Sequence, residues 1–153
     1  MFKINKKVEY SLMVLKHFKD HPAQTLITAR EVCDKYHTPF DTTSRVMQLM
    51  NNKKILGSSQ GVKGGYKLER SLEDITYLEL LEIIEQKCFD KNCSEINCSL
   101  IESCNITGPI QKLNQQLISF FKSITLNSLL TSEDENIQIQ NLDQDKNNEY
   151  RIR

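Results

Sequence analysis

Four of the five cysteines in this sequence lie close together, and they are the residues best suited to chemistry. They are Cys88, Cys93, Cys98 and Cys104, so four, four and five residues separate successive thiols. The series lacks the Cys-x2-Cys pair on which most structural zinc sites are built. Wider spacing between thiolates favours an iron–sulfur cluster held by an open loop, which needs about four ligands. Structural zinc and a cluster-free thiol switch, in which cysteines become sulfenic acid or disulfide, are the alternatives.

The compartment expected for this chain also favours metal or redox chemistry at these cysteines. No run of the sequence approaches the about 18 consecutive apolar residues of a membrane span. The N-terminus lacks the apolar run and the cleavage site of a signal peptide. We therefore expect a cytoplasmic protein without membrane contact, where thiols stay reduced and a disulfide scaffold is not expected.

Apolar periodicity and capping residues predict the elements of the first part of the chain. They are helices over about residues 4–18, 29–36 and 41–53, and then a β-hairpin around GVKGG at residues 61–65. Thr28 is the expected cap of the second helix, and Asp41 or Thr42 that of the third. Three glycines within five residues supply the positive φ angles of a sharp turn. This order predicts a winged helix-turn-helix, whose third helix enters the major groove of DNA.

The third helix carries polar side chains suited to DNA. These side chains are Thr42, Thr43, Ser44, Arg45 and Gln48. Arg45 can pair bidentately with guanine and Gln48 with adenine, and each such pair is worth ~1–3 kcal/mol of base discrimination. The short hydroxyls suit phosphate contacts. Phosphate attraction that does not depend on base sequence is expected from Lys53, Lys54, Lys63 and Lys67.

The second part of the chain is predicted to hold a sensor loop, a long helix and a tail. Thr76 is the expected cap of a helix that reaches about Gln86. The cysteine-bearing residues 88–104 show no long apolar period and are expected to form a loop. Residues 110–124 have the apolar stripe of an amphipathic helix. Residues 131–153 contain 13 Asp, Glu, Asn or Gln out of 23, which predicts a disordered tail.

These elements predict a mainly α-helical chain with a small β-hairpin wing. We divide it into a DNA-binding region, 1–70, a region with the sensor loop and a long C-terminal helix, 71–130, and the tail, 131–153. The formal net charge of zero conceals an asymmetry between the two parts. Residues 1–70 contain 13 Lys or Arg against 6 Asp or Glu, whereas residues 71–153 contain 7 against 14. DNA binding is therefore expected in the first part, whose net charge is +7.

Other classes of function fit these features less well. The three histidines, His17, His21 and His37, fall near predicted helix ends or turns with no accompanying nucleophile pattern. No phosphate-binding glycine motif precedes a helix, so we do not expect an enzyme. An iron–sulfur electron-transfer protein is a further alternative, but it would have no use for a basic winged-helix region.

Several stretches together resemble one family of bacterial regulators. They are KKVEY at residues 6–10, GVKGGYKL at 61–68, DIT at 74–76, and Cys98-x5-Cys104 followed by a long helix and ITL at 124–126. Over about residues 1–130 the chain resembles the winged-helix iron–sulfur and redox transcriptional regulators of the IscR and NsrR type, the Rrf-two family. The resemblance implies a DNA-binding repressor that senses redox state, nitric oxide or iron–sulfur status. The cofactor that it implies is a 4Fe–4S or 2Fe–2S cluster.

The resemblance also implies a subunit arrangement and a set of cluster ligands. It implies a homodimer in which the long helix, about 109–124, packs against its mate, and each cluster loop lies close to the partner's first helix. Cys93, Cys98 and Cys104 match the three cysteines of the family motif. Thr107 stands where IscR-like members place a histidine ligand, whereas Glu9 matches the carboxylate that NsrR-like members draw from the first helix. The implied ligands are three cysteines and Glu9. The additional Cys88 could take the place of Cys93 or complete an all-cysteine site.

The wing is the second DNA-binding element that the resemblance implies. Gln60 stands before the glycines, where the family commonly has an arginine. Gln60, Lys63 and Tyr66 are the wing residues expected at the DNA, with Lys63 as the source of positive charge.

Overall fold

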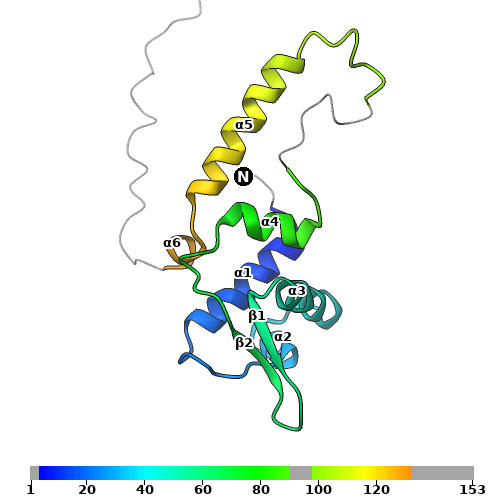
Figure 1. The fold of residues 1–153 in the computed structure, drawn as a ribbon. Coiled ribbons are helices and arrows are strands. Elements are labelled where there is room, and N and C mark those ends of the chain that lie inside the picture. The colour runs from blue at the N-terminus through cyan, green and yellow to red at the C-terminus, as the bar shows by residue number, and fades with distance from the viewer. Residues whose placement is uncertain (1–3, 90–97, 132–153) are drawn as a thin grey trace, which may run out of the picture.

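The computed structural model describes residues 4–89 and 98–131, which form six helices and one two-stranded sheet (Figure 1). In chain order they are α1 (Lys6–Lys19), α2 (Ala29–Tyr36), α3 (Phe40–Asn52), β1 (Leu56–Ser59), β2 (Gly65–Leu68), α4 (Tyr77–Glu85), α5 (Thr107–Ser123) and α6 (Leu126–Leu130). In Figure 1, α1, α3 and α4 form the middle of the molecule, while the hairpin and α5 extend in opposite directions. The order of elements is that of the predicted winged helix-turn-helix. Of the predicted tail, residues 132–153 lie outside the described residues.

Side-chain caps define where two of the predicted helices begin. The Thr28 hydroxyl accepts a hydrogen bond from the Glu31 backbone N–H at 3.1 Å, and the Thr76 hydroxyl accepts one from Glu79 at 3.2 Å. Each bond satisfies an amide that has no partner within its own helix. The expected cap of α3 is wrong, because α3 begins one residue earlier and its N-cap is Pro39, which provides no side-chain hydrogen bond.

One hydrophobic core draws on both parts of the chain. Its fully buried members include Val8 and Leu15 of α1, Met50 of α3, Leu80 of α4 and Leu126 of α6. Helix α6 was not predicted from the sequence. It is joined to the segment before α4 by backbone hydrogen bonds, from Leu126 N–H to the Ile75 carbonyl and from Tyr77 N–H to the Ile124 carbonyl, both 2.8 Å. The chain that follows α5 therefore returns to the core on which α1 and α4 pack.

The wing is a short antiparallel hairpin fixed at its base. Its register pairs Leu56 with Leu68 and Ser59 with Gly65. At the tip, Gly61 has a φ of 117°, and a Cβ on Gly64 would lie 2.5 Å from the Ser59 carbonyl oxygen. The turn therefore requires both glycines.

A third segment extends the hairpin on the β2 side. Ile27, in the connection between α1 and α2, exchanges two backbone hydrogen bonds of 2.8 Å with Tyr66. This bridge fixes the wing to the helix-turn-helix unit.

Helix α5 is longer than predicted and is packed along only a small part of its surface. It begins at Thr107 rather than near residue 110, and Ile118 is its one buried residue among those described. Phe121 packs edge-on against Tyr77, with ring centroids 5.2 Å apart. No helix in the described ranges is long and apolar enough to cross a membrane.

Candidate DNA-binding surface and cysteine segment

Helix α3 presents two long polar side chains on the face opposite its buried residues. Val46, Met47 and Met50 are fully buried, which fixes the rotation of the helix. Arg45 and Gln48 are consequently exposed. Both side chains are therefore available for a base edge in a DNA groove.

The three short polar residues near the start of α3 differ in accessibility. Thr42 and Ser44 are partly exposed, as a phosphate contact requires. Thr43 is fully buried, and its hydroxyl donates to the Thr38 hydroxyl at 2.8 Å. The prediction that Thr43 contacts DNA is wrong, because its side chain belongs to the core and joins α3 to the turn before it.

The predicted lysines lie around α3 and the wing. Lys53 and Lys54 follow the end of α3 and are exposed, and Lys63 is exposed at the wing tip beside Gln60. Tyr66 is half-buried and packs against the core through part of its ring. Of the wing residues expected at the DNA, Gln60 and Lys63 are thus the accessible ones.

Two residues beside this surface were not among the sequence-based candidates. Lys7 is exposed at the start of α1 and lines, with Thr42 and Arg45, a shallow pocket of about 200 Å³. The Lys6-Lys7 pair was the only sequence signal for it. Val62 is fully exposed at the wing tip, as its place in the glycine-rich turn at residues 61–65 would indicate.

The described cysteines near the sensor segment are free thiols on accessible parts of the chain. Cys88 and Cys98 are exposed and Cys104 is partly exposed. Cys93 lies outside the described residues. Cys98 begins a turn that is closed by a hydrogen bond from the Ile101 N–H to the Cys98 carbonyl at 3.3 Å. Thiols placed in this way are accessible to a metal, a cluster or an oxidant.

Cys104 lies just before α5, where the helix start affects its acidity. The Thr107 hydroxyl and the backbone N–H groups of Ile106 and Thr107 lower the pKa of the Cys104 thiol. A hydrogen-bonded thiolate is the form that binds metals and reacts with oxidants. Thr107 stands where IscR-like members carry a histidine, and its effect here is to lower the pKa of the candidate ligand Cys104.

Glu9 lies in the first turn of α1, half-exposed and paired with the Lys6 ammonium. Within the described residues, Glu9 and the cysteines Cys88, Cys98 and Cys104 do not come together as a group of ligand atoms. The Glu9 contact with Lys6 spans only three residues at the surface, so it is weak and easily exchanged. The single chain thus presents these candidate ligands separately.

The sequence matches one known protein family over most of its length. A family model named Rrf2, described as an iron-dependent transcriptional regulator, matches residues 4–132, which is most of the chain. The chain belongs to the Rrf2 family. This membership agrees with the expectation of a DNA-binding regulator that is not an enzyme.

Individual relatives of this Rrf2 chain are similar over most of their length. The HTH-type transcriptional regulator NsrR of Halalkalibacterium halodurans is 24% identical over 134 residues, covering 83% of this chain and 89% of the relative. The structure of CymR (YrzC), the global cysteine regulator of B. subtilis, matches with a TM-score of 0.65 at 15% identity, covering 85% of this chain and 97% of that one. T. potens IscR matches with a TM-score of 0.56 at 18% identity, covering 84% and 86%. The two structures share the winged-helix fold with this chain.

The donor atoms of this Rrf2 chain fit an iron–sulfur cluster. Thiolates are the protein ligands of such clusters, and Cys88, Cys98 and Cys104 are free, accessible and grouped within one stretch of sequence. The lowered pKa of the Cys104 thiol favours the ligating form. The Glu9 carboxylate, half-exposed on α1, is a further oxygen donor for such a set of ligands.

Proposed function

We propose that this Rrf2 transcriptional regulator controls its operator through an iron–sulfur cluster held by Cys93, Cys98, Cys104 and the Glu9 carboxylate, with Cys88 as the substitute ligand. The carrying observation is the free, accessible thiols of Cys98 and Cys104 where the sensor segment enters α5, together with hydrogen bonds from Thr107 and Ile106 that lower the pKa of the Cys104 thiol. Similarity to NsrR over most of the chain supports the same proposal. When bound, a cluster supplies a redox-labile and nitric-oxide-reactive centre. We expect a regulator that binds operator DNA and depends on reduced thiols to act in the cytoplasm.

The ligand set combines donors of different character. Three thiolates are soft donors that favour iron–sulfur chemistry, whereas the Glu9 carboxylate is a hard and weakly held donor. We therefore expect Glu9 to be the ligand that is released first. The released Glu9 carboxylate would then be free to form its ion pair with the Lys6 ammonium.

The sensor segment is connected to α3 through α4. A pocket of about 490 Å³ is lined by Leu49, Asn52 and Lys53 at the end of α3 together with Ile83 of α4 and Cys88. A change of ligands at the cysteines can therefore be transmitted through α4 to α3, the predicted recognition helix. This is the route by which we propose that the sensor segment alters operator affinity.

The regulator is proposed to act as a homodimer joined through α5. Ile110, Leu113, Leu117 and Phe120 are apolar residues that remain 43–59% exposed along this helix. A second α5 would cover them, and two recognition helices would then face successive major grooves about 34–36 Å apart. Because these side chains are already about half-buried, covering the rest of each one contributes roughly half of the about 1.5–3 kcal/mol that complete burial provides.

Sedimentation of two variants tests the dimer. Leu113→Glu places a charge in the proposed interface and should give monomers at concentrations at which the unaltered protein is dimeric. Gln115→Glu adds the same charge at an exposed polar position of the same helix and should remain dimeric. A Leu113→Glu variant that stays dimeric would remove α5 from the interface.

Purification without oxygen tests the cofactor. The unaltered protein should be brown, contain iron and sulfide, and lose its visible absorption together with a change in operator affinity after nitric oxide. Cys98→Ser should abolish the colour, while Cys33→Ser, which removes a thiol from α2, should retain it. A colourless protein that contains only zinc after reconstitution contradicts the proposal.

A cluster-free thiol switch is the second candidate function. The acidified Cys104 thiol is also the form that peroxides oxidise, and the fold is shared with the oxidized form of Staphylococcus aureus CymR, at a TM-score of 0.64 and 16% identity. This candidate predicts a colourless protein whose operator affinity changes with peroxide and is restored by a thiol reductant. The iron and sulfide assay distinguishes the two.

A further inference from the structure

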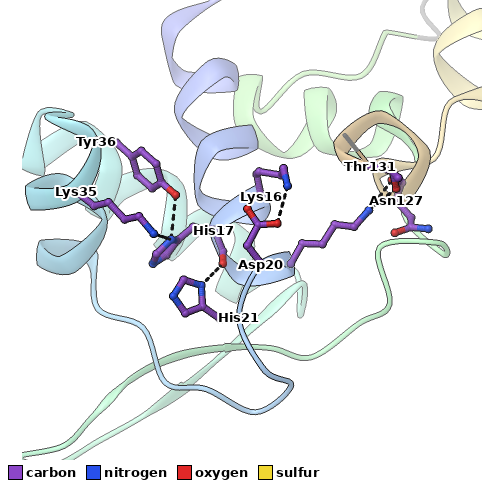
Figure 2. Close-up of polar contacts among 9 residues, drawn as sticks. Lys16, His17, Asp20, His21, Lys35, Tyr36, Asn127 and Thr131 are labelled. Atoms are coloured by element: carbon purple, nitrogen blue, oxygen red, sulfur yellow. Dashed lines mark hydrogen bonds and ion pairs between the residues drawn. The ribbon is translucent and has the colours of Figure 1, made fainter. Parts of the chain in front are cut away.

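A buried histidine with one unpartnered ring nitrogen lies between α1 and α2. His17 is only 1% exposed, and its Nδ1 lies 3.1 Å from the Tyr36 hydroxyl (Figure 2). Within the described chain, its Nε2 is the one buried side-chain nitrogen or oxygen without a hydrogen-bond partner. Oε1 of Glu31 lies 3.5 Å from this nitrogen. A buried polar atom of this kind costs about 1–3 kcal/mol unless something binds to it.

A second histidine faces the first. The His21 ring packs edge-on against the His17 ring, with centroids 4.1 Å apart. Nδ1 of His21 lies 2.6 Å from the backbone carbonyl oxygen of His17, to which it donates a hydrogen bond. Because Nδ1 of His21 donates to a carbonyl oxygen, its Nε2 is an electron-pair donor. Nε2 of His17 is also an electron-pair donor in the tautomer whose Nδ1–H donates to the Tyr36 hydroxyl.

Glu31 completes the group from the first turn of α2. His17, His21 and Glu31 each offer one ligand atom, and these atoms all lie within 4.8 Å of one another. We propose that the three residues form a binding site for one divalent transition-metal ion of the Zn²⁺ class. Two imidazoles and one carboxylate are an established ligand set for zinc, with a fourth position left for water.

The surroundings of the site match the requirements of metal-bound histidine. A ligating imidazole is oriented by an oxygen partner on its other nitrogen, and the His17 carbonyl and the Tyr36 hydroxyl are placed to do this. Burial lowers the pKa of His17, against the opposing effect of Glu31, so the imidazole is neutral at pH 7, as a ligand must be.

One neighbouring charge opposes a cation at this position. The Lys35 ammonium lies 3.5 Å from Nδ1 of His17 and over the Tyr36 ring, 5.5 Å from its centroid (Figure 2). Lys35 is exposed, so its side chain can turn into solvent when a cation enters. The Glu31 carboxylate supplies the compensating negative charge.

The location of the site gives it a structural role that is separate from that of the cysteines. His17 belongs to the last turn of α1, His21 to the connection after it, and Glu31 to the start of α2. A bound ion would hold α2 against the end of α1. Because α2 leads through a short turn into α3, this contact lies within the DNA-binding unit, and it does not depend on the proposed cluster.

Zinc titration of a full-length chain tests this site directly. To remove competing thiolates, Cys88, Cys93, Cys98 and Cys104 are replaced by serine in every protein compared. Isothermal titration calorimetry with Zn²⁺ should give a stoichiometry of about one. Glu31→Gln and His21→Gln should each weaken binding by more than the about 10–100-fold that loss of an outer-shell partner costs.

Matched controls and a second measurement make the test specific. Asp34→Asn removes the same charge from an exposed position of α2, and His37→Asn removes an exposed histidine; both should bind Zn²⁺ like the parent. Imidazole nitrogen NMR should show the Nε2 signals of His17 and His21 shifting together on zinc addition. Absence of zinc binding, or equal affinity of Glu31→Gln and Asp34→Asn, overturns the proposal.

Discussion

Arg45 and Gln48 are both exposed on one face of α3, and their side chains are suited to different bases. The Arg45 guanidinium is suited to guanine and the Gln48 amide to adenine. We expect Arg45→Ala to reduce the preference for operator over random DNA by about 1–3 kcal/mol, because one bidentate base contact is lost. Fluorescence anisotropy with both DNA duplexes measures this preference. An unchanged preference would mean that α3 does not present Arg45 to a base.

Lys63 provides the contrast to Arg45. It lies at the wing tip, where a lysine contributes charge and no directional base contact. Lys63→Ala should weaken binding to operator and random DNA alike, and should lower the slope of log affinity against log salt by about 1. A salt series on both duplexes measures this. Loss confined to the operator would instead assign Lys63 to base recognition.

His17 makes stability depend on pH. Burial lowers the pKa of His17 below its ordinary value of 6.5. The unfolded chain therefore binds a proton that the folded chain does not, so the stabilising contribution is complete above pH 6.5 and is lost as pH falls toward the lower pKa of the folded state. Denaturant unfolding with a chelator present should show the unaltered protein losing more stability between pH 7 and 5 than His17→Leu does. His37→Asn, at an exposed position, should behave like the unaltered protein.

The exposure of a side chain could be predicted where it follows from the helical period of its neighbours. Arg45 and Gln48 are exposed as expected, because apolar neighbours fix the rotation of α3. The same period places Thr43 on the buried face with Val46 and Met47, but its polar side chain was assigned to DNA instead. The hydroxyl that satisfies it, that of Thr38, lies before the helix. The pairing of His17 with Glu31 was equally hidden, since it joins two helices across a connection.

The turn of the wing requires a glycine at position 64, where backbone atoms leave no room for a side chain. A Cβ at Gly64 would lie 2.5 Å from the Ser59 carbonyl oxygen and 2.9 Å from that of Gly61. Both oxygens belong to the backbone, so this clash cannot be relieved by the movement of a flexible side chain. Gly64→Ala should destabilise the hairpin by about 1–3 kcal/mol and reduce DNA affinity. Gly108→Ala, at a position with open space, should leave affinity unchanged and stabilise α5 by up to about 1 kcal/mol. Chemical denaturation and DNA titration of both variants test this.

Elements with local signals were predictable, and those fixed by distant contacts were not. Caps at Thr28 and Thr76 lie next to the helices that they begin, so both helix starts followed from the sequence. Helix α6 has only five residues, and its place depends on hydrogen bonds to Ile75 and Leu72, more than 50 positions earlier. No local pattern could reveal that contact.

At the scale of the whole molecule, charge is divided along the chain. Residues 131–153 hold 6 Asp or Glu and 3 Lys or Arg, and so contribute −3 to the acidic second part. Removing them should raise affinity for random DNA, because less negative charge then opposes the phosphates. Anisotropy titrations of random duplex at low salt would show the increase. Equal affinity of the full and shortened chains for random DNA would mean that the tail does not affect DNA binding.

The accessibility of the candidate cysteine ligands could be predicted from the sequence, but their distance from Glu9 could not. The positions of the thiols in the sequence predicted an open segment, and the described cysteines are accessible. Sequence spacing does not determine how far Glu9, on α1, lies from that segment. Within the described residues the candidate ligands remain apart, so complete ligation is a property to be measured on the assembled protein.

The bridge between Ile27 and Tyr66 determines how the wing opens. Each of these amides donates to the other residue's carbonyl, at 2.8 Å in both directions. Neither proton can exchange with deuterium until the two segments separate, so both should exchange at one common rate. Gly64, nearer the tip, donates only to Gly61 within the turn and should exchange sooner. The wing thus has a slowly exchanging base, shared with the connection between α1 and α2, and a rapidly exchanging tip.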